Sequence, residues 1–133
     1  MKKTTLFIML ALVIGASSCK SKRMFPVNER AEPDIPVREE RFSFTQETDR
    51  ISQQNNTFFV VMGSFQNRDN AEGFSETLRG LGFTPTILLS ETGFHRVSVN
   101  SFLSEDNARS RVLQIREEFP DYADTWLLIK KDD

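Results

Sequence analysis

Aromatic, arginine and hydroxyl side chains alternate within short apolar runs of the sequence. Phe94, Arg96 and Ser98 follow one another with a period of two, so they share one face if this run is a β-strand. Aromatic rings stack on flat or partly apolar ligands, while arginine and serine donate hydrogen bonds. This chemistry suits either nucleobases or sugar rings. The candidate ligand-binding residues, from three predicted strands, are Phe59, Val61, Ser64, Phe94, Arg96, Ser98, Trp126 and Leu128.

Residues that could carry catalysis or bind a metal are few. The sequence has one histidine, His95, and one cysteine, Cys19, which excludes a Cys-His dyad and a histidine-rich metal site. His95 alternates to the opposite side of its strand, where we expect a structural role. A glycosidase needs two carboxylates about 5 to 10 Å apart across a cleft, and none is evident on the predicted binding face. We therefore predict no catalytic residues, no cofactor and no metal.

A repeated motif indicates which elements position these side chains. The pattern Ser-Phe, three residues, then Asp-Asn-Ala begins at Ser64 and again at Ser101, 37 positions later. Each copy follows an apolar run typical of a strand and opens a stretch with helical spacing. The repeat therefore predicts a duplicated β-α-β unit.

Hydrophobic periodicity extends this pattern over residues 57–133. Alternation predicts strands, and spacing of three and four predicts helices that end at Gly80 to Gly82 and before Pro120. The predicted strands cover 58–65, 84–90, 94–100 and 125–130, and the helices 68–81 and about 104–118. The fold class is therefore α+β, with the ferredoxin-like (RNP-like) order β-α-β-β-α-β. Right-handed crossovers put both helices on one face of a four-stranded antiparallel sheet.

The two faces of this sheet differ in composition. The helix-covered face should hold Phe58, Val60, Met62, Val97, Val99, Thr125, Leu127 and Ile129. The other face should hold the candidate residues named above except Ser64, together with Gly63 and Lys130. An uncovered face rich in aromatic residues normally marks an interaction surface. Three alternatives stay open: residues 20–56 cover this face, a partner protomer covers it, or the register is shifted by one residue.

The N-terminus has the features of an export signal. Lys2 and Lys3 precede an apolar run and a stretch of small residues that ends at Cys19. This stretch resembles a bacterial lipobox, although Ala16 and Ser18 depart from the strictest pattern. The resemblance implies a signal peptide over 1–18, cleavage before Cys19, and a lipid anchor on that residue. The alternative is a signal peptide whose last small residue happens to be cysteine.

Residues 20–56 are predicted to be a flexible tether. They contain three prolines, seven Lys/Arg and seven Asp/Glu, and few adjacent apolar residues, so they bury too little surface to offset ordering. A short strand over 37–44 is the alternative. The domain over 57–133 has eight Lys/Arg against twelve Asp/Glu. An acidic domain argues against a binder of nucleic-acid backbones.

Two segments resemble the SPOR (sporulation-related repeat) domain family. They are the run from Phe58 to Phe65 with the helix start after it, and the run from Phe94 to Phe102. The resemblance implies the β-α-β-β-α-β fold and non-catalytic binding of septal peptidoglycan, favouring glycan strands without stem peptides. It places the ligand on the uncovered sheet face. Ser64, Phe94, Arg96 and Trp126 match family positions, whereas Val61 replaces a common Gln, and Asn100-Ser101 replace a usual Gly-Pro.

Together these features lead to one expectation about the whole protein. We expect a lipoprotein anchored through Cys19, with Lys20 favouring the outer membrane facing the periplasm. It would serve cell division or the envelope and bind peptidoglycan glycan strands and possible divisome proteins, but no nucleic acid. The alternatives are a protein-interaction adaptor that uses the same sheet face and, only if export fails, an RNA-binding module.

Overall fold

The computed structural model describes residues 34–133, so the predictions for the segment 1–18 and for Cys19 lie outside the described residues. The elements in chain order are β1 (Val37–Glu40), β2 (Phe42–Phe44), α1 (Glu47–Gln53), β3 (Phe58–Phe65), α2 (Arg68–Gly80), β4 (Thr86–Ser90), β5 (His95–Phe102), α3 (Glu105–Glu118), the 3-10 turn η1 (Pro120–Tyr122) and β6 (Trp126–Lys130). From β3 onward the predicted order β-α-β-β-α-β is confirmed, with ends shifted by one or two residues.

The sheet is larger than predicted. Its strand order is β1-β6-β3-β5-β4-β2, so two further strands flank the four that the sequence indicated. β1 pairs in parallel with β6, and β2 pairs antiparallel with β4. The prediction of a purely antiparallel four-stranded sheet is therefore wrong, and the sheet in residues 34–133 is six-stranded and mixed.

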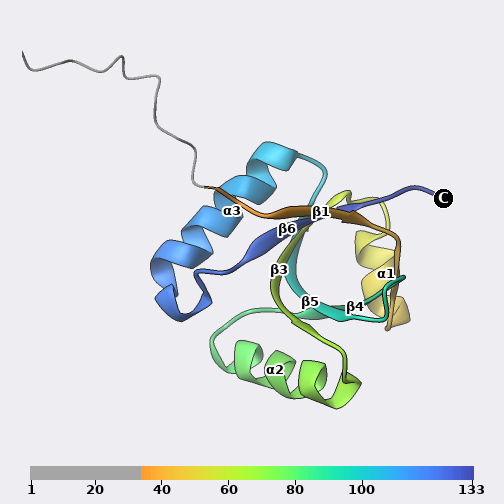
Figure 1. Cartoon of the computed structure of the whole chain (residues 1–133), viewed down its shortest axis with the longest axis horizontal. Helices are drawn as coiled ribbons and strands as arrows, with labels where there is room; N and C mark the ends of the chain where they lie inside the picture. Colours follow the sequence, from red (N-terminus) through yellow and green to blue (C-terminus); the bar gives the residue numbers. More distant parts are fainter. Residues whose placement is uncertain (1–33) are drawn as a thin grey trace, which may run out of the picture. The chain divides into compact units, whose positions relative to one another are not determined.

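A single extended run connects the two edges of this sheet. Arg41 alone separates β1 from β2, although the two strands lie at opposite ends of the strand order. The strands consequently curve around one face of the sheet, with α2 and α3 outside the curve (Figure 1). We call the face packed against α2 and α3 the helix face, and the enclosed one the inner face.

The prediction of a flexible tether is wrong for residues 34–56. This N-terminal segment contributes β1, β2 and α1 and belongs to one compact unit with the rest of the described chain. Phe42 and Phe44 pack against Phe59, with ring centroids 5.0 and 6.0 Å away. Composition suggested a tether because it counts every charge as solvated, whereas here Glu40 is buried. The alternative of a short strand over 37–44 was closer, since two strands occupy these residues.

The two copies of the repeated motif begin the helices that cover the helix face. The two copies provide helix caps: Asn67 Oδ1 accepts from the backbone N–H of Asp69 at 2.8 Å, and Ser104 Oγ accepts from that of Asn107 at 3.4 Å. The capped helices bury their apolar stripes against the sheet. The resulting core includes Val60, Met62, Ala71, Leu78, Val97, Val99, Ala108, Val112, Ile115 and Leu127.

An irregularity in β3 changes which residues reach the inner face. Val61 pairs with Ser98 while Gly63 pairs with the adjacent Val97, so the register shifts around Met62. A Cβ on Gly63 would lie 2.6 Å from the ring of Phe74 on α2. Gly63 therefore faces the helices, not the inner face as alternation predicted, and its lack of a side chain admits Phe74. The shift turns Ser64 toward the inner face, where it pairs with Arg96.

Within residues 34–133, the helices are too short or too polar to cross a lipid bilayer.

Candidate functional site

The inner face is covered, contrary to the expectation of an open surface. Phe59, Val61 and Leu128 are fully buried and form a second cluster with Leu88. Phe42, Phe44 and Trp126 pack against this cluster. Of the three alternatives raised by the sequence, coverage by residues of the 20–56 segment is the one that the structure confirms. Four predicted site residues, Phe59, Val61, Ser98 and Leu128, consequently lie beneath this cover.

A buried ion pair joins β1, which helps to cover the inner face, to β5 of the sheet. Arg96 donates to both carboxylate oxygens of Glu40, from Nη2 at 2.7 Å and from Nε at 3.2 Å. Ser90 Oγ donates to the same carboxylate at 2.8 Å. The side chains of Arg96 and Glu40 are 5% and 8% exposed, so water competes little for these bonds. Burial raises the pKa of Glu40, but the hydrogen bonds and charges of Arg96, Ser90 and Arg38 outweigh it and hold that pKa below its ordinary value.

Two aromatic rings flank the same arginine. The guanidinium carbon of Arg96 lies 4.7 Å from the ring centroid of Phe94 and 5.3 Å from that of Trp126. Both distances allow cation–π attraction. Arg96 is thus held by a carboxylate and lies within cation–π distance of two rings.

A pocket opens at the end of the inner face where β6 and β5 begin and β3 ends. Its volume is about 280 Å³, and its lining residues are Pro36, Arg38, Ser64, Arg96 and Trp126. Three predicted site residues therefore meet here, and Phe94 stacks beside them on Arg96. Pro36 and Arg38 were missed by the sequence reasoning. The alternation of Arg38, Glu40, Phe42 and Phe44 was the signal that could have revealed a strand carrying them.

The pocket presents a cation, a hydroxyl and an aromatic ring. Arg38 Nη1 lies 4.0 Å from Glu40, and the Arg38 side chain is 65% exposed. Ser64 Oγ is buried and, within residues 34–133, has no hydrogen-bond partner. Trp126 is half-buried. These groups can bind a ligand that combines a ring, a polar substituent and a negative charge.

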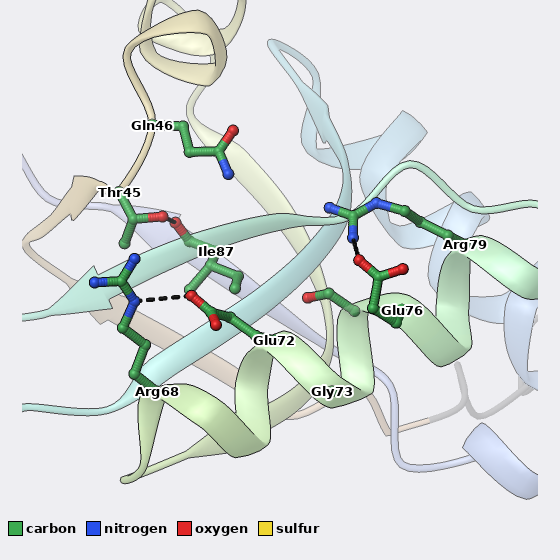
Figure 2. A pocket seen from close by; sticks show the side chains of 9 residues that line it. Thr45, Gln46, Arg68, Glu72, Gly73, Glu76, Arg79 and Ile87 are labelled. Atoms are coloured by element: carbon green, nitrogen blue, oxygen red, sulfur yellow. Dashed lines mark hydrogen bonds and ion pairs between the residues drawn. The ribbon is translucent and has the colours of Figure 1, made fainter.

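A larger pocket lies elsewhere and contains none of the predicted site residues. It has a volume of about 410 Å³ and lies between α2 and the start of α1, above Ile87 of β4. Figure 2 shows that its arginines are paired with glutamates on the same helix, Arg68 with Glu72 and Arg79 with Glu76. Because these charges cancel in pairs, the pocket offers no unmatched charge to a ligand.

The one histidine of the sequence can also be placed on the fold. His95 faces the helix side, opposite Phe65 in the register, as the alternation predicted. Its Nδ1 is buried and makes no hydrogen bond in the part of the chain that the structure describes. That part also holds no group of three His, Cys, Asp or Glu side chains able to bind a metal ion.

Comparison with known proteins identifies the family. The SPOR domain model matches residues 54–123, which is more than half of the 133 residues. No curated protein and no solved structure matches the chain. The matched region runs from before β3 to η1, so it includes Ser64 and Arg96 of the pocket but not Pro36, Arg38 or Trp126. The chain belongs to the SPOR domain family, whose known role is to bind peptidoglycan.

Proposed function

We propose that this protein binds peptidoglycan glycan strands without catalysing a reaction, and that the strand contacts the pocket formed by Pro36, Arg38, Ser64, Arg96 and Trp126. The family supports the ligand class. The observation that carries the choice of site is that Ser64, Arg96 and Trp126, which come from three different strands, line one pocket. SPOR domains are binding domains, which agrees with a non-catalytic role.

Each group in the pocket has a role that follows from its chemistry. The indole of Trp126 offers an apolar surface to the C–H face of a sugar ring. Ser64 Oγ, buried without a partner among the described residues, supplies a hydrogen bond to a ring substituent. Phe94, whose ring centroid lies 4.7 Å from the guanidinium carbon of Arg96, extends the aromatic surface next to this arginine. In this proposal Phe59, Val61, Ser98 and Leu128 support the site from below and do not touch the glycan.

We further propose that the glycan preferred is septal and free of stem peptides, and that Cys19 carries a lipid anchor after removal of residues 1–18. The protein would then act in cell division or the envelope, on the outer membrane facing the periplasm. The small residues before Cys19 support the anchor. Replacing Cys19 with serine should release the protein from membranes in a carbonate wash, and continued retention would contradict the anchor.

The glycan expectation and the adaptor alternative both required the sheet face opposite the helices to be accessible. That face is filled by the cluster of Phe59, Val61, Leu88 and Leu128 and covered by Phe42 and Phe44. The pocket at its end, of about 280 Å³, is open, and the ligand class of the family favours a glycan there.

Co-sedimentation of the full chain with purified sacculi tests the proposed site. Trp126→Leu keeps an apolar side chain on the inner cluster but removes the stacking ring, so binding should fall about two- to twelvefold. Phe119→Leu is the matched control, because Phe119 is a half-buried aromatic residue that packs on the helix-face core. Equal binding by the two variants, or no loss in either, would show that the glycan binds elsewhere.

A further inference from the structure

We propose that Arg38 makes this pocket a reader of acidic sugars, and that it recognises the carboxylate left on the lactyl ether of a glycan when the stem peptide is removed. This inference rests on the proposed glycan-binding function and names the group that would set its preference. Arg38 lies on β1, outside the region matched by the family model. The proposed preference would therefore come from a strand added to the SPOR domain.

The charges around the pocket leave Arg38 available. Arg96 and Glu40 neutralise each other through two hydrogen bonds. Ser90 Oγ donates a third hydrogen bond to the same carboxylate. Within residues 34–133, Glu40 is the one carboxylate within 4.0 Å of Arg38, and it lies at the limit of that distance. The pocket thus keeps a net positive charge on an arginine that is two-thirds exposed.

The backbone places this charge beside the other polar and aromatic groups. Arg38 pairs with Leu128 in the parallel β1–β6 ladder, two residues along the strand from Trp126. Ser64 pairs with Arg96 in the β3–β5 ladder. Pro36 fixes the start of β1, because its carbonyl oxygen accepts a hydrogen bond from the backbone N–H of Leu127 at 3.0 Å. Arg38 therefore stands on a paired strand, which limits its freedom before a ligand arrives.

Peptidoglycan glycan with a stem peptide and glycan without one differ in charge at the lactyl group. A stem peptide is joined to the sugar's lactyl group through an amide, which carries no charge. Hydrolysis of that amide leaves a carboxylate at the same position. A guanidinium binds a carboxylate through charge-assisted hydrogen bonds but gains much less from an amide. A pocket with one unmatched arginine would thus favour the stripped glycan.

Binding of the full chain to two forms of one glycan tests this inference. One probe is peptide-free glycan prepared with an amidase, and the other is the same glycan with its carboxylates capped as methyl amides. The wild-type chain should bind the free acid about two- to fivefold more tightly. Arg38→Gln should reduce this ratio to about one, and Arg38→Lys, which keeps the charge, should retain part of it.

The control and the contrary outcomes separate this inference from the function on which it rests. Arg68→Gln removes the same charge from a side chain that is 70% exposed on α2 and should leave the ratio unchanged. If the wild-type ratio is one, or if Arg38→Gln keeps the wild-type ratio, Arg38 does not read the carboxylate, although glycan binding stands. If the wild-type chain binds neither probe, the proposed function itself fails.

Discussion

The two faces of the sheet are covered in different ways. The helix face is covered by α2 and α3, and its core is a cluster of apolar side chains. The inner face is covered by a segment from outside the matched family region, and it encloses the polar residues Arg96, Glu40 and Ser98 as well as apolar ones. Both faces thus bury apolar side chains that stabilise the fold, and the inner face also places charged groups where a pocket opens.

The largest expected effect comes from breaking the ion pair of the inner face. Glu40→Ala leaves the guanidinium of Arg96 buried without its carboxylate. Removing one partner of a buried pair costs about 3–5 kcal/mol of unfolding free energy, which urea unfolding would measure. Glu39→Ala is the matched control on the same strand, since Glu39 is exposed, and it should cost less than about 0.5 kcal/mol. Equal costs for the two variants would mean that β1 is not held on the sheet as described.

A second comparison uses adjacent leucines on β6. Leu127 belongs to the helix-face core and Leu128 to the inner cluster, and both are fully buried. Truncation to alanine should cost about 2–5 kcal/mol at either position, as measured by the same unfolding experiment. A much smaller loss for Leu128→Ala would show that the cover from the N-terminal segment opens readily and adds little to the fold.

The helix face could be predicted from the sequence because its signals are local. Helical spacing and the stops at Gly80 to Gly82 and Pro120 each act within a few residues. All of them agree with the structure. The repeat beginning at Ser64 and Ser101 indicated that the β-α-β unit is duplicated.

The inner face could not be predicted in the same way because its signals are not local. The cover depends on pairing β1 with β6, about 90 residues away in the sequence. From the sequence alone Glu40 is expected to be solvated, because its partner Arg96 is distant in the chain. The register shift around Met62 in β3 likewise reversed the side expected for Gly63. As a result the sequence indicated most of the residues that share the inner face, but not which of them are buried and which line the pocket.

The smallest expected effect is a change in unfolding free energy at acidic pH that arises from the carboxylate of Glu40. Because the fold lowers the pKa of Glu40 from its ordinary value of 4.5, the ion pair stabilises the fold fully above about pH 4.5. That contribution is lost as pH falls below 4.5 and passes through the lowered pKa. The difference in unfolding free energy between wild type and Glu40→Gln should therefore shrink on acidification from pH 6 to pH 3.

Comparing these two chains removes the effect of other groups that titrate in the same range. Asp49 changes stability in the opposite direction, because burial raises its pKa despite the nearby charge of Arg79. It is present in both proteins, so it cancels in the difference. A difference that stays constant down to pH 3 would mean that the Glu40 carboxylate is no more acidic in the fold than in the unfolded chain. The ion pair would then not account for the attachment of β1 to the inner face.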